Sequence, residues 1–426
     1  MLVICRLKTC VWYGTIAISQ IHEGYTLHFP CLSQLIYAAK EHLFETTPHY
    51  PRYQVHRFPH CLVYVQNSKK HRCILRLDTR IRHRAQGCTL QDTMKRFAVL
   101  SVVALATLGN ALVRFQCSQL VIERLDPLVN PGMVPSAHVH QIVGGNSFNA
   151  SMDPKKDMPG ESTCTTCSFA EDFSNYWTAV LYFKARNGTY KRVPQSSQIQ
   201  GAKGGITVYY MQDALYDQQQ KSKVTAFKPG FRMFTGNVAA RTKAEMAQFR
   251  QLTYTCMDNQ GTREPESLDF PTRPCPAGIM VNARFPTCWD GVNLDSPDHM
   301  AHMSYPANGT FESGGPCPAS HPIRMPQVLF EVVWETRQFN NKADWPADGS
   351  QPFVWSFGDG TGFGNHADYV FGWKDDALQR LMDQPCVVNC PGAHAKTQST
   401  AAMNKCAKQK TVTEDIDGWL TSLPGM

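Results

Sequence analysis

The chain has 426 residues, of which 42% are hydrophobic, so it contains ample material for a sizeable core and could form more than one domain. Its formal net charge of +7 is unevenly distributed, because twelve of the 42 Lys and Arg but only five of the 35 Asp and Glu precede Met94. Lys95 and Arg96 are two more basic residues, so 28 basic and 30 acidic residues follow residue 111, a balance of about −2. That balance removes the electrostatic basis for a nucleic-acid or anionic-membrane partner.

The first quarter of the chain differs from the rest. Residues 1–93 hold eight of the fifteen His and six of the sixteen Cys and show no sustained helical or strand period, so we interpret them as a gene-model extension. Residues 94–111 have the basic start, apolar run and small-residue exit of a signal peptide. An internal core helix is the alternative, as is a signal anchor if residues 1–93 are translated. We expect cleavage near Leu112, a secreted, extracellular or cell-wall-associated product and no stable membrane partner.

Ten cysteines follow Leu112, an even number that predicts up to five disulfides in a secreted chain without fixing their connectivity. Cys164 and Cys167 could form a redox or zinc motif, but no second such motif occurs at zinc-ribbon spacing, so structural bridging is favoured. The sequons at Asn149, Asn187 and Asn308 are typical of the same compartment and predict a glycoprotein.

Residues 112–426 are predicted to form a single domain of short strands separated by turns. Asn187-Gly188 is a typical hairpin turn, and helical patterning is confined to Ala244–Leu252 and Asp375–Met382. The predicted strands are Tyr176–Phe183, Tyr190–Val193, Ile206–Met211 and Val328–Trp334. We therefore predict an all-β fold of sandwich or jelly-roll type, stapled by disulfides and carrying long loops, with α+β as the alternative.

The most informative stretch is Arg124–Phe148, RLDPLVNPGMVPSAHVHQIVGGNSF. Its Pro and Gly residues predict a rigid loop that leads into a strand. Because side chains alternate along a strand, His138 and His140 should point to the same face. This pair is therefore a candidate functional site.

Two further motifs combine histidines with carboxylates and aromatic rings. They are FPTCWDGVNLDSPDHMAHMSYP, residues 285–306, and FVWSFGDGTGFGNHADYVFGW, residues 353–373. Five of the seven histidines after residue 112 lie in these motifs and in Arg124–Phe148, so we expect them to line one concave surface. The predicted catalytic residues are His138, His140, His299, His302, His366, Asp298 and Asp368. The predicted substrate-binding residues are Trp289, Asp290, Tyr305, Tyr369 and Trp373.

Aromatic rings beside carboxylates and imidazoles suit a polysaccharide or oligosaccharide. The favoured interpretation is a glycan-active hydrolase or lyase that uses metal-free acid–base chemistry, in which an imidazole bonds a carboxylate such as Asp368 and its pKa rises. The alternatives are Zn²⁺ or Cu²⁺ binding through His138 and His140, and a non-catalytic glycan-binding or wall-associated protein. The same aromatic and acidic residues could also be core residues and turn caps, so whether the protein is an enzyme stays open.

These motifs, together with the closing DGWLTSLPG, resemble the secreted fungal domain-of-unknown-function family DUF1996. The resemblance covers about residues 115–426 and does not include residues 1–93. Members of that family often carry modules that bind cell-wall polysaccharide, so the resemblance implies a role at the cell wall.

Overall fold

The computed structural model describes residues 25–28, 62–67, 72–76 and 112–426, apart from 198–199, 213–223, 260, 308–314 and 384–394. The chain divides into two compact units, residues 1–105 and 106–426. In the first unit, β1 (Tyr25–His28), β2 (Leu62–Asn67) and β3 (Arg72–Arg76) form an antiparallel sheet in that order. Residues 94–111 lie outside the described residues, so the signal peptide and the gene-model extension stay predictions.

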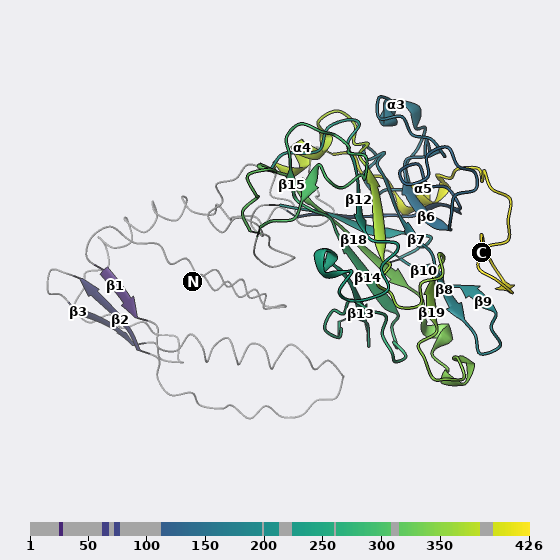
Figure 1. The fold of residues 1–426 in the computed structure, drawn as a ribbon. Coiled ribbons are helices and arrows are strands. Elements are labelled where there is room, and N and C mark those ends of the chain that lie inside the picture. Colours follow the sequence, from purple (N-terminus) through teal and green to yellow (C-terminus); the bar gives the residue numbers. More distant parts are fainter. Residues whose placement is uncertain are drawn as a thin grey trace. The chain divides into compact units, whose positions relative to one another are not determined.

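The second unit is a sandwich of two antiparallel sheets (Figure 1). One sheet has the order β13-β14-β18-β11-β4, with β10 also paired to β18, and the other has the order β12-β20-β7-β6-β5. The strands of the first sheet are β4 (Leu112–Cys117), β10 (Gln195–Ser196), β11 (Ile206–Met211), β13 (Leu252–Cys256), β14 (Ile279–Arg284) and β18 (Gln327–Trp334). Those of the second are β5 (Gln119–Glu123), β6 (His140–Gly144), β7 (Asn175–Ala179), β12 (Arg232–Gly236) and β20 (His366–Val370).

Smaller elements surround the sandwich. Two short sheets have the orders β16-β15-β17 and β19-β8-β9-β21. Their strands are β8 (Leu181–Lys184), β9 (Tyr190–Arg192), β15 (Cys288–Trp289), β16 (Met303–Ser304), β17 (Ile323–Arg324), β19 (Phe353–Trp355) and β21 (Trp419–Leu420). The helices are α3 (Met158–Glu161), α4 (Ala377–Met382) and α5 (Thr400–Lys405), with 3₁₀ turns η2 (Ala247–Phe249), η3 (Arg337–Phe339) and η4 (Lys342–Asp344).

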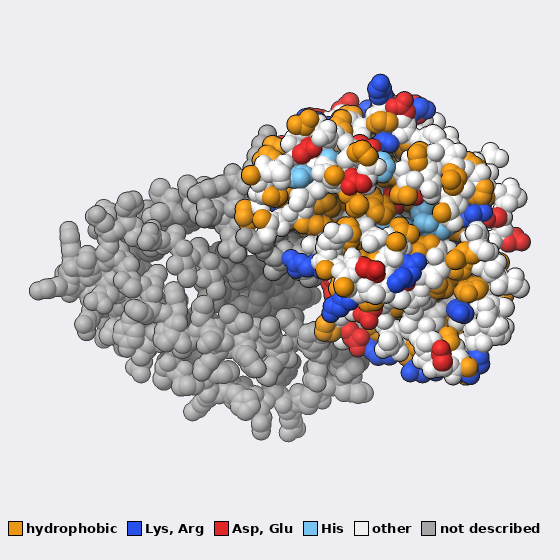
Figure 2. Space-filling view, in the orientation of Figure 1, with side chains coloured by type: hydrophobic (Ala, Val, Ile, Leu, Met, Phe, Trp, Pro, Cys, Tyr) orange, Lys and Arg blue, Asp and Glu red, His pale blue; other side chains and the backbone are white. Residues whose placement is uncertain are grey.

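The all-β prediction is confirmed. No described helix exceeds six residues, which rules out the α+β alternative for this part of the chain. Nor does any helix there have the length and hydrophobicity needed to cross a bilayer. On the face drawn in Figure 2, basic and acidic side chains are interspersed over the described part of the surface, in keeping with the near-neutral balance.

Large aromatic side chains fill the space between the two sheets. Tyr176 on β7 packs edge-on against Phe330 on β18, with ring centroids 5.6 Å apart. Tyr210 on β11 and Tyr369 on β20 join hydroxyl to hydroxyl at 2.9 Å across the same core. These apolar and aromatic runs form strands because both of their faces are buried.

Local patterns predicted the strands better than the helices. Ile206–Met211 forms β11 as predicted, and the Asn187-Gly188 turn joins β8 to β9, with Gly188 at φ +85°. The predicted strand Tyr176–Phe183 is interrupted at Val180, between β7 and β8. The predicted helix Ala244–Leu252 is wrong, because its helical part is the 3₁₀ turn η2 and Leu252 begins β13.

The described residues form four disulfides, and the preference for structural bridging is confirmed. Cys164 and Cys167 do not bond to each other. The pairs are Cys117–Cys167, Cys164–Cys406, Cys256–Cys275 and Cys288–Cys317. Cys386 and Cys390 lie outside the described residues, so a fifth bridge stays a prediction. Asn149 and Asn187 are exposed, whereas Asn308 lies outside the described residues.

Candidate metal centre

The loop that precedes β6 is held by its own polar residues. The Asp126 carboxylate accepts hydrogen bonds from the backbone N–H groups of Leu128 and Val129, both at 3.1 Å. Such a turn is what Asp followed by Pro favours. His138 lies at the end of this loop, two residues before His140, which is the first residue of β6. The two imidazoles lie on the same side, with ring centroids 4.2 Å apart. The predicted alternation is confirmed.

A third histidine joins this pair from the other end of the sequence. His366 is the first residue of β20, and its Nε2 lies 3.2 Å from Nε2 of His138. Each of the three residues offers a ligand atom, and these atoms lie within 4.8 Å of one another. We call His138, His140 and His366 the three-histidine cluster. All three side chains are buried.

Small residues make room for the cluster. In the sheet, His140 lies opposite Ala179 on β7, and His366 lies opposite Gly236 on β12. Neither neighbour has a side chain beyond Cβ, so the imidazoles can lean together over the sheet. Phe357 covers them, with its ring centroid 5.0 Å from that of His138 and 5.1 Å from that of His366.

Backbone carbonyls fix the orientation of two imidazoles. Nδ1 of His140 donates to the Leu125 carbonyl at 3.0 Å, and Nδ1 of His366 donates to the Gly364 carbonyl at 2.9 Å. In a neutral ring the other nitrogen, Nε2, then carries the free lone pair. Nε2 of His140 has no hydrogen-bond partner among the described residues. A carbonyl behind Nδ1 and a bare Nε2 in front is how proteins orient metal-binding histidines.

Burial keeps the cluster neutral. Desolvation lowers the pKa of His140 to about 3 and that of His366 to about 4. The pKa of His138 is also lowered, first by desolvation and then by repulsion from the other two imidazoles. Neutral imidazoles suit metal binding but not donation of a proton near neutral pH.

The acid–base prediction is therefore not supported at this cluster. It expected an imidazole bonded to a carboxylate such as Asp368, with a raised pKa. Neither oxygen of Asp368 has a hydrogen-bond partner among the described residues, and the pKa of each clustered histidine is lowered. Burial also raises the pKa of Asp368.

The remaining predicted catalytic residues lie in a neighbouring loop and are otherwise engaged. His299 bonds Asp295 at 2.6 Å and the Leu128 carbonyl at 3.0 Å, and the Asp295 bond raises its pKa. His302 donates to the Arg232 carbonyl at 2.9 Å. Asp298 is exposed, and its carboxylate caps a turn by accepting hydrogen bonds from the backbone N–H groups of Met300 and Ala301. None of the three belongs to the three-histidine cluster, because hydrogen bonds within the loop and to backbone carbonyls occupy them.

The predicted aromatic sugar platforms are in the core. Trp289, Tyr369 and Trp373 are buried, so none presents a ring face to a ligand in this structure. Tyr305 is half-buried and bonds Thr235 and the Arg284 carbonyl, and Asp290 caps a turn.

Sequence reasoning missed an exposed aromatic residue instead. Trp419 on β21 is 56% exposed. Its position in the closing DGWLTSLPG, directly after a Gly and outside any long apolar run, is the signal that could have identified it.

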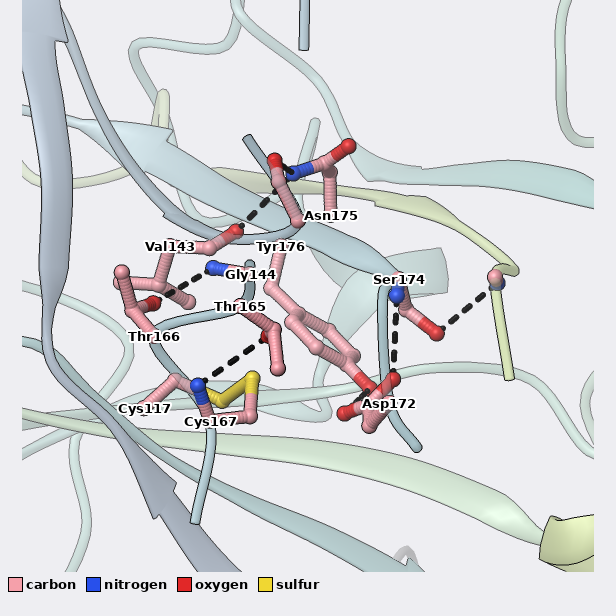
Figure 3. The surroundings of a disulfide bond; sticks show 12 residues. Cys117, Val143, Gly144, Thr165, Thr166, Cys167, Asp172, Ser174, Asn175 and Tyr176 are labelled. Carbon is pink, nitrogen blue, oxygen red and sulfur yellow. Dashed lines mark hydrogen bonds between the residues drawn. A yellow bond between two sulfur atoms is a disulfide. The ribbon is translucent and has the colours of Figure 1, made fainter. Parts of the chain in front are cut away.

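A second group of potential ligands consists of Cys117, Cys167 and Asp172. The two cysteines form a disulfide, which Figure 3 shows beside Asp172, so their sulfurs are not available as thiolates. This group therefore holds no metal site.

Comparison with known proteins identifies a family for this chain, but it finds no matching curated protein and no matching solved structure. A family model described as a domain of unknown function, DUF1996, matches residues 126–373. This range contains every residue of the three-histidine cluster.

Proposed function

The chain belongs to the DUF1996 family, and we propose that it is a metal-binding protein whose three-histidine cluster holds one Zn²⁺ or Cu²⁺ ion. The observation that carries this proposal is the convergence of three buried imidazoles. Backbone carbonyls bind Nδ1 of His140 and of His366, and Nε2 of His140 has no hydrogen-bond partner among the described residues. His140 is fully buried, and the lone pair of its Nε2 has no hydrogen-bond partner among the described residues, so a cation bound there would remove an unfavourable unpaired acceptor.

The distances also suit a metal ion. At a Zn–N distance of about 2.0–2.1 Å, nitrogens around a tetrahedral ion lie roughly 3.3 Å apart. The Nε2 atoms of His138 and His366 are 3.2 Å apart, close to this spacing, and the ligand atom of His140 lies within 4.8 Å of the other two ligand atoms. Three imidazoles without a thiolate suit Zn²⁺ and Cu²⁺, and they leave a position open for water or substrate.

The metal-binding proposal predicts one ion per chain. Protein stripped with a chelator and dialysed should take up one equivalent of Zn²⁺ or Cu²⁺ in isothermal titration calorimetry. Its melting temperature should then rise, because the ion binds the folded state. Failure of the stripped protein to bind either ion would contradict the proposal.

We further propose that the protein is secreted and contacts cell-wall or extracellular polysaccharide. The disulfides suit an oxidising compartment, and the exposed Trp419 favours the glycan contact. Trp419 lies on β21, which pairs with β9. The Lys191 ammonium of β9 lies over the indole ring of Trp419, 5.2 Å from the ring centroid. A sugar ring could stack on this indole while its hydroxyls bond the neighbouring polar groups.

Replacing Trp419 with alanine should weaken retention on an insoluble polysaccharide by about tenfold, because the exposed stacking surface is lost. Sedimentation with cellulose, chitin and β-glucan measures the bound fraction, and release of reducing ends with and without chelator shows whether binding leads to cleavage. Val292→Ala removes another exposed apolar side chain and is the matched control. If wild-type protein binds none of the polymers, or if both variants bind equally, the glycan contact at Trp419 is wrong.

A further inference from the structure

A carboxylate beside the three-histidine cluster lacks the partners that a buried charge requires. Asp368 is fully buried, and both of its carboxylate oxygens are without a hydrogen-bond donor in the described part of the chain. Its cross-strand neighbours are Phe234 on β12 and Trp177 on β7. A carboxylate in such surroundings is strongly unfavourable unless a cation or a donor compensates it. The two carboxylate oxygens of Asp368 are therefore available to accept hydrogen bonds or to compensate a cation.

This carboxylate faces the same side of the sheet as the cluster. Side chains alternate along β20, so His366 and Asp368 point to one side and Ala367 to the other. Phe234, the cross-strand neighbour of Asp368, has its ring centroid 5.6 Å from that of His366. Asp126 directly follows Leu125, whose carbonyl accepts the hydrogen bond from His140. The two carboxylates and the cluster thus share one buried region.

Asp126 and Asp368 differ in how much of their hydrogen-bond acceptor capacity is already used. One oxygen of Asp126 already accepts two backbone N–H groups. Asp368 keeps the lone pairs of both oxygens. Its oxygens are not in the group of ligand atoms that lie within 4.8 Å of one another, so an ion held by the imidazoles would reach Asp368 through an intervening molecule.

We propose that Asp368 is a positioning residue of the metal centre, which accepts a hydrogen bond from a water molecule bound to the ion at the position that the imidazoles leave open. This inference rests on the metal centre proposed above. A divalent ion with three neutral imidazoles carries two uncompensated positive charges, and Asp368 balances part of them. Water held on an ion in this way is the species that a hydrolytic metal site delivers to its substrate.

The test compares two buried carboxylates. Asp368→Asn removes the charge at nearly constant volume and should weaken Zn²⁺ binding by about 10–100-fold in calorimetry. Co²⁺ bound in place of Zn²⁺ should show an altered visible absorption spectrum, a readout that a purely structural role would not change. Asp172→Asn makes the same substitution at a fully buried carboxylate that is hydrogen-bonded to other partners, and it should leave both readouts as in the wild type.

Asp368→Glu provides a second test in case Asp368→Asn does not fold. It keeps the charge but moves it by one methylene, so binding should persist with a shifted Co²⁺ spectrum. Wild-type affinity and an unchanged spectrum in Asp368→Asn, or in Asp368→Glu if the first variant is unfolded, would overturn the role of Asp368 alone. Absence of metal binding in the wild type would instead overturn the metal centre and this inference with it.

Discussion

Replacing His366 with alanine is expected to lower the affinity for Zn²⁺ or Cu²⁺ by about a thousandfold. Three ligands of a protein zinc site share a binding free energy on the order of 10–16 kcal/mol, so the loss of one ligand removes about 4 kcal/mol. His366 is the ligand that comes from β20, and its Nδ1 is fixed by the Gly364 carbonyl. Competition with a chromophoric chelator of known affinity measures the change.

The control for this experiment is a histidine outside the cluster. His321 bonds Ser320 and the Ala301 carbonyl in a loop, and His321→Ala should retain wild-type affinity. Circular dichroism of both metal-free variants shows whether each remains folded. The three-histidine centre is wrong if folded His366→Ala binds the ion as tightly as the wild type does.

The local half of this centre could be predicted from the sequence, but the distant half could only be suspected. Alternation along a strand placed His138 and His140 on one side, because it depends on neighbouring residues alone. His366 lies 228 residues from His138, and it reaches the pair because β20 and β6 both pair with β7. Strand order is set by packing of the whole domain, which short-range patterns do not contain.

Short-range sequence patterns also do not show which side chains are already engaged in the fold, and this explains why His299 and Tyr369 were wrongly grouped with the candidate site. His299 shares the composition of the candidate motifs, yet Asp295 and the Leu128 carbonyl occupy its two ring nitrogens. Tyr369 lies next to Asp368, but the pleat turns it into the core between the sheets. Composition indicates which side chains are chemically capable, whereas the choice of sheet face decides which of them are free.

A buried acid far from the surface gives the second large expected effect. Asp172 is fully buried, and Figure 3 shows it beside the Cys117–Cys167 disulfide. It accepts hydrogen bonds from the backbone N–H of Ser174 at 3.0 Å and from the Tyr176 hydroxyl at 2.7 Å. Burial raises its pKa to about 7 and outweighs these bonds, which lower it. The folded domain therefore holds a proton here that the unfolded chain releases near pH 4.

This raised pKa should make the domain less stable as pH rises. Between pH 4 and pH 7 the folded state binds more protons than the unfolded state at this position, so the free energy of unfolding falls by about 1.4 kcal/mol per pH unit. The contribution is fully present below pH 4 and is lost by about pH 7, on the order of 4 kcal/mol in all.

Asp172→Asn should remove that dependence. An amide cannot ionise, and it can still accept from the Ser174 N–H while it donates to the Tyr176 hydroxyl, which in turn can donate to Tyr210. The variant and the wild type should therefore be similarly stable near pH 4. Above pH 7 the variant should be more stable, by on the order of 4 kcal/mol.

Guanidinium unfolding of both proteins, with disulfides intact and a chelator present, measures this difference at half-unit pH steps. The chelator keeps metal linkage out of the comparison, and the histidine titrations cancel because both proteins share them. A stability difference that stays constant from pH 4 to pH 8 would show that Asp172 is ionised in the folded state throughout. In that case the Tyr176 and Ser174 hydrogen bonds, rather than burial, would dominate its pKa.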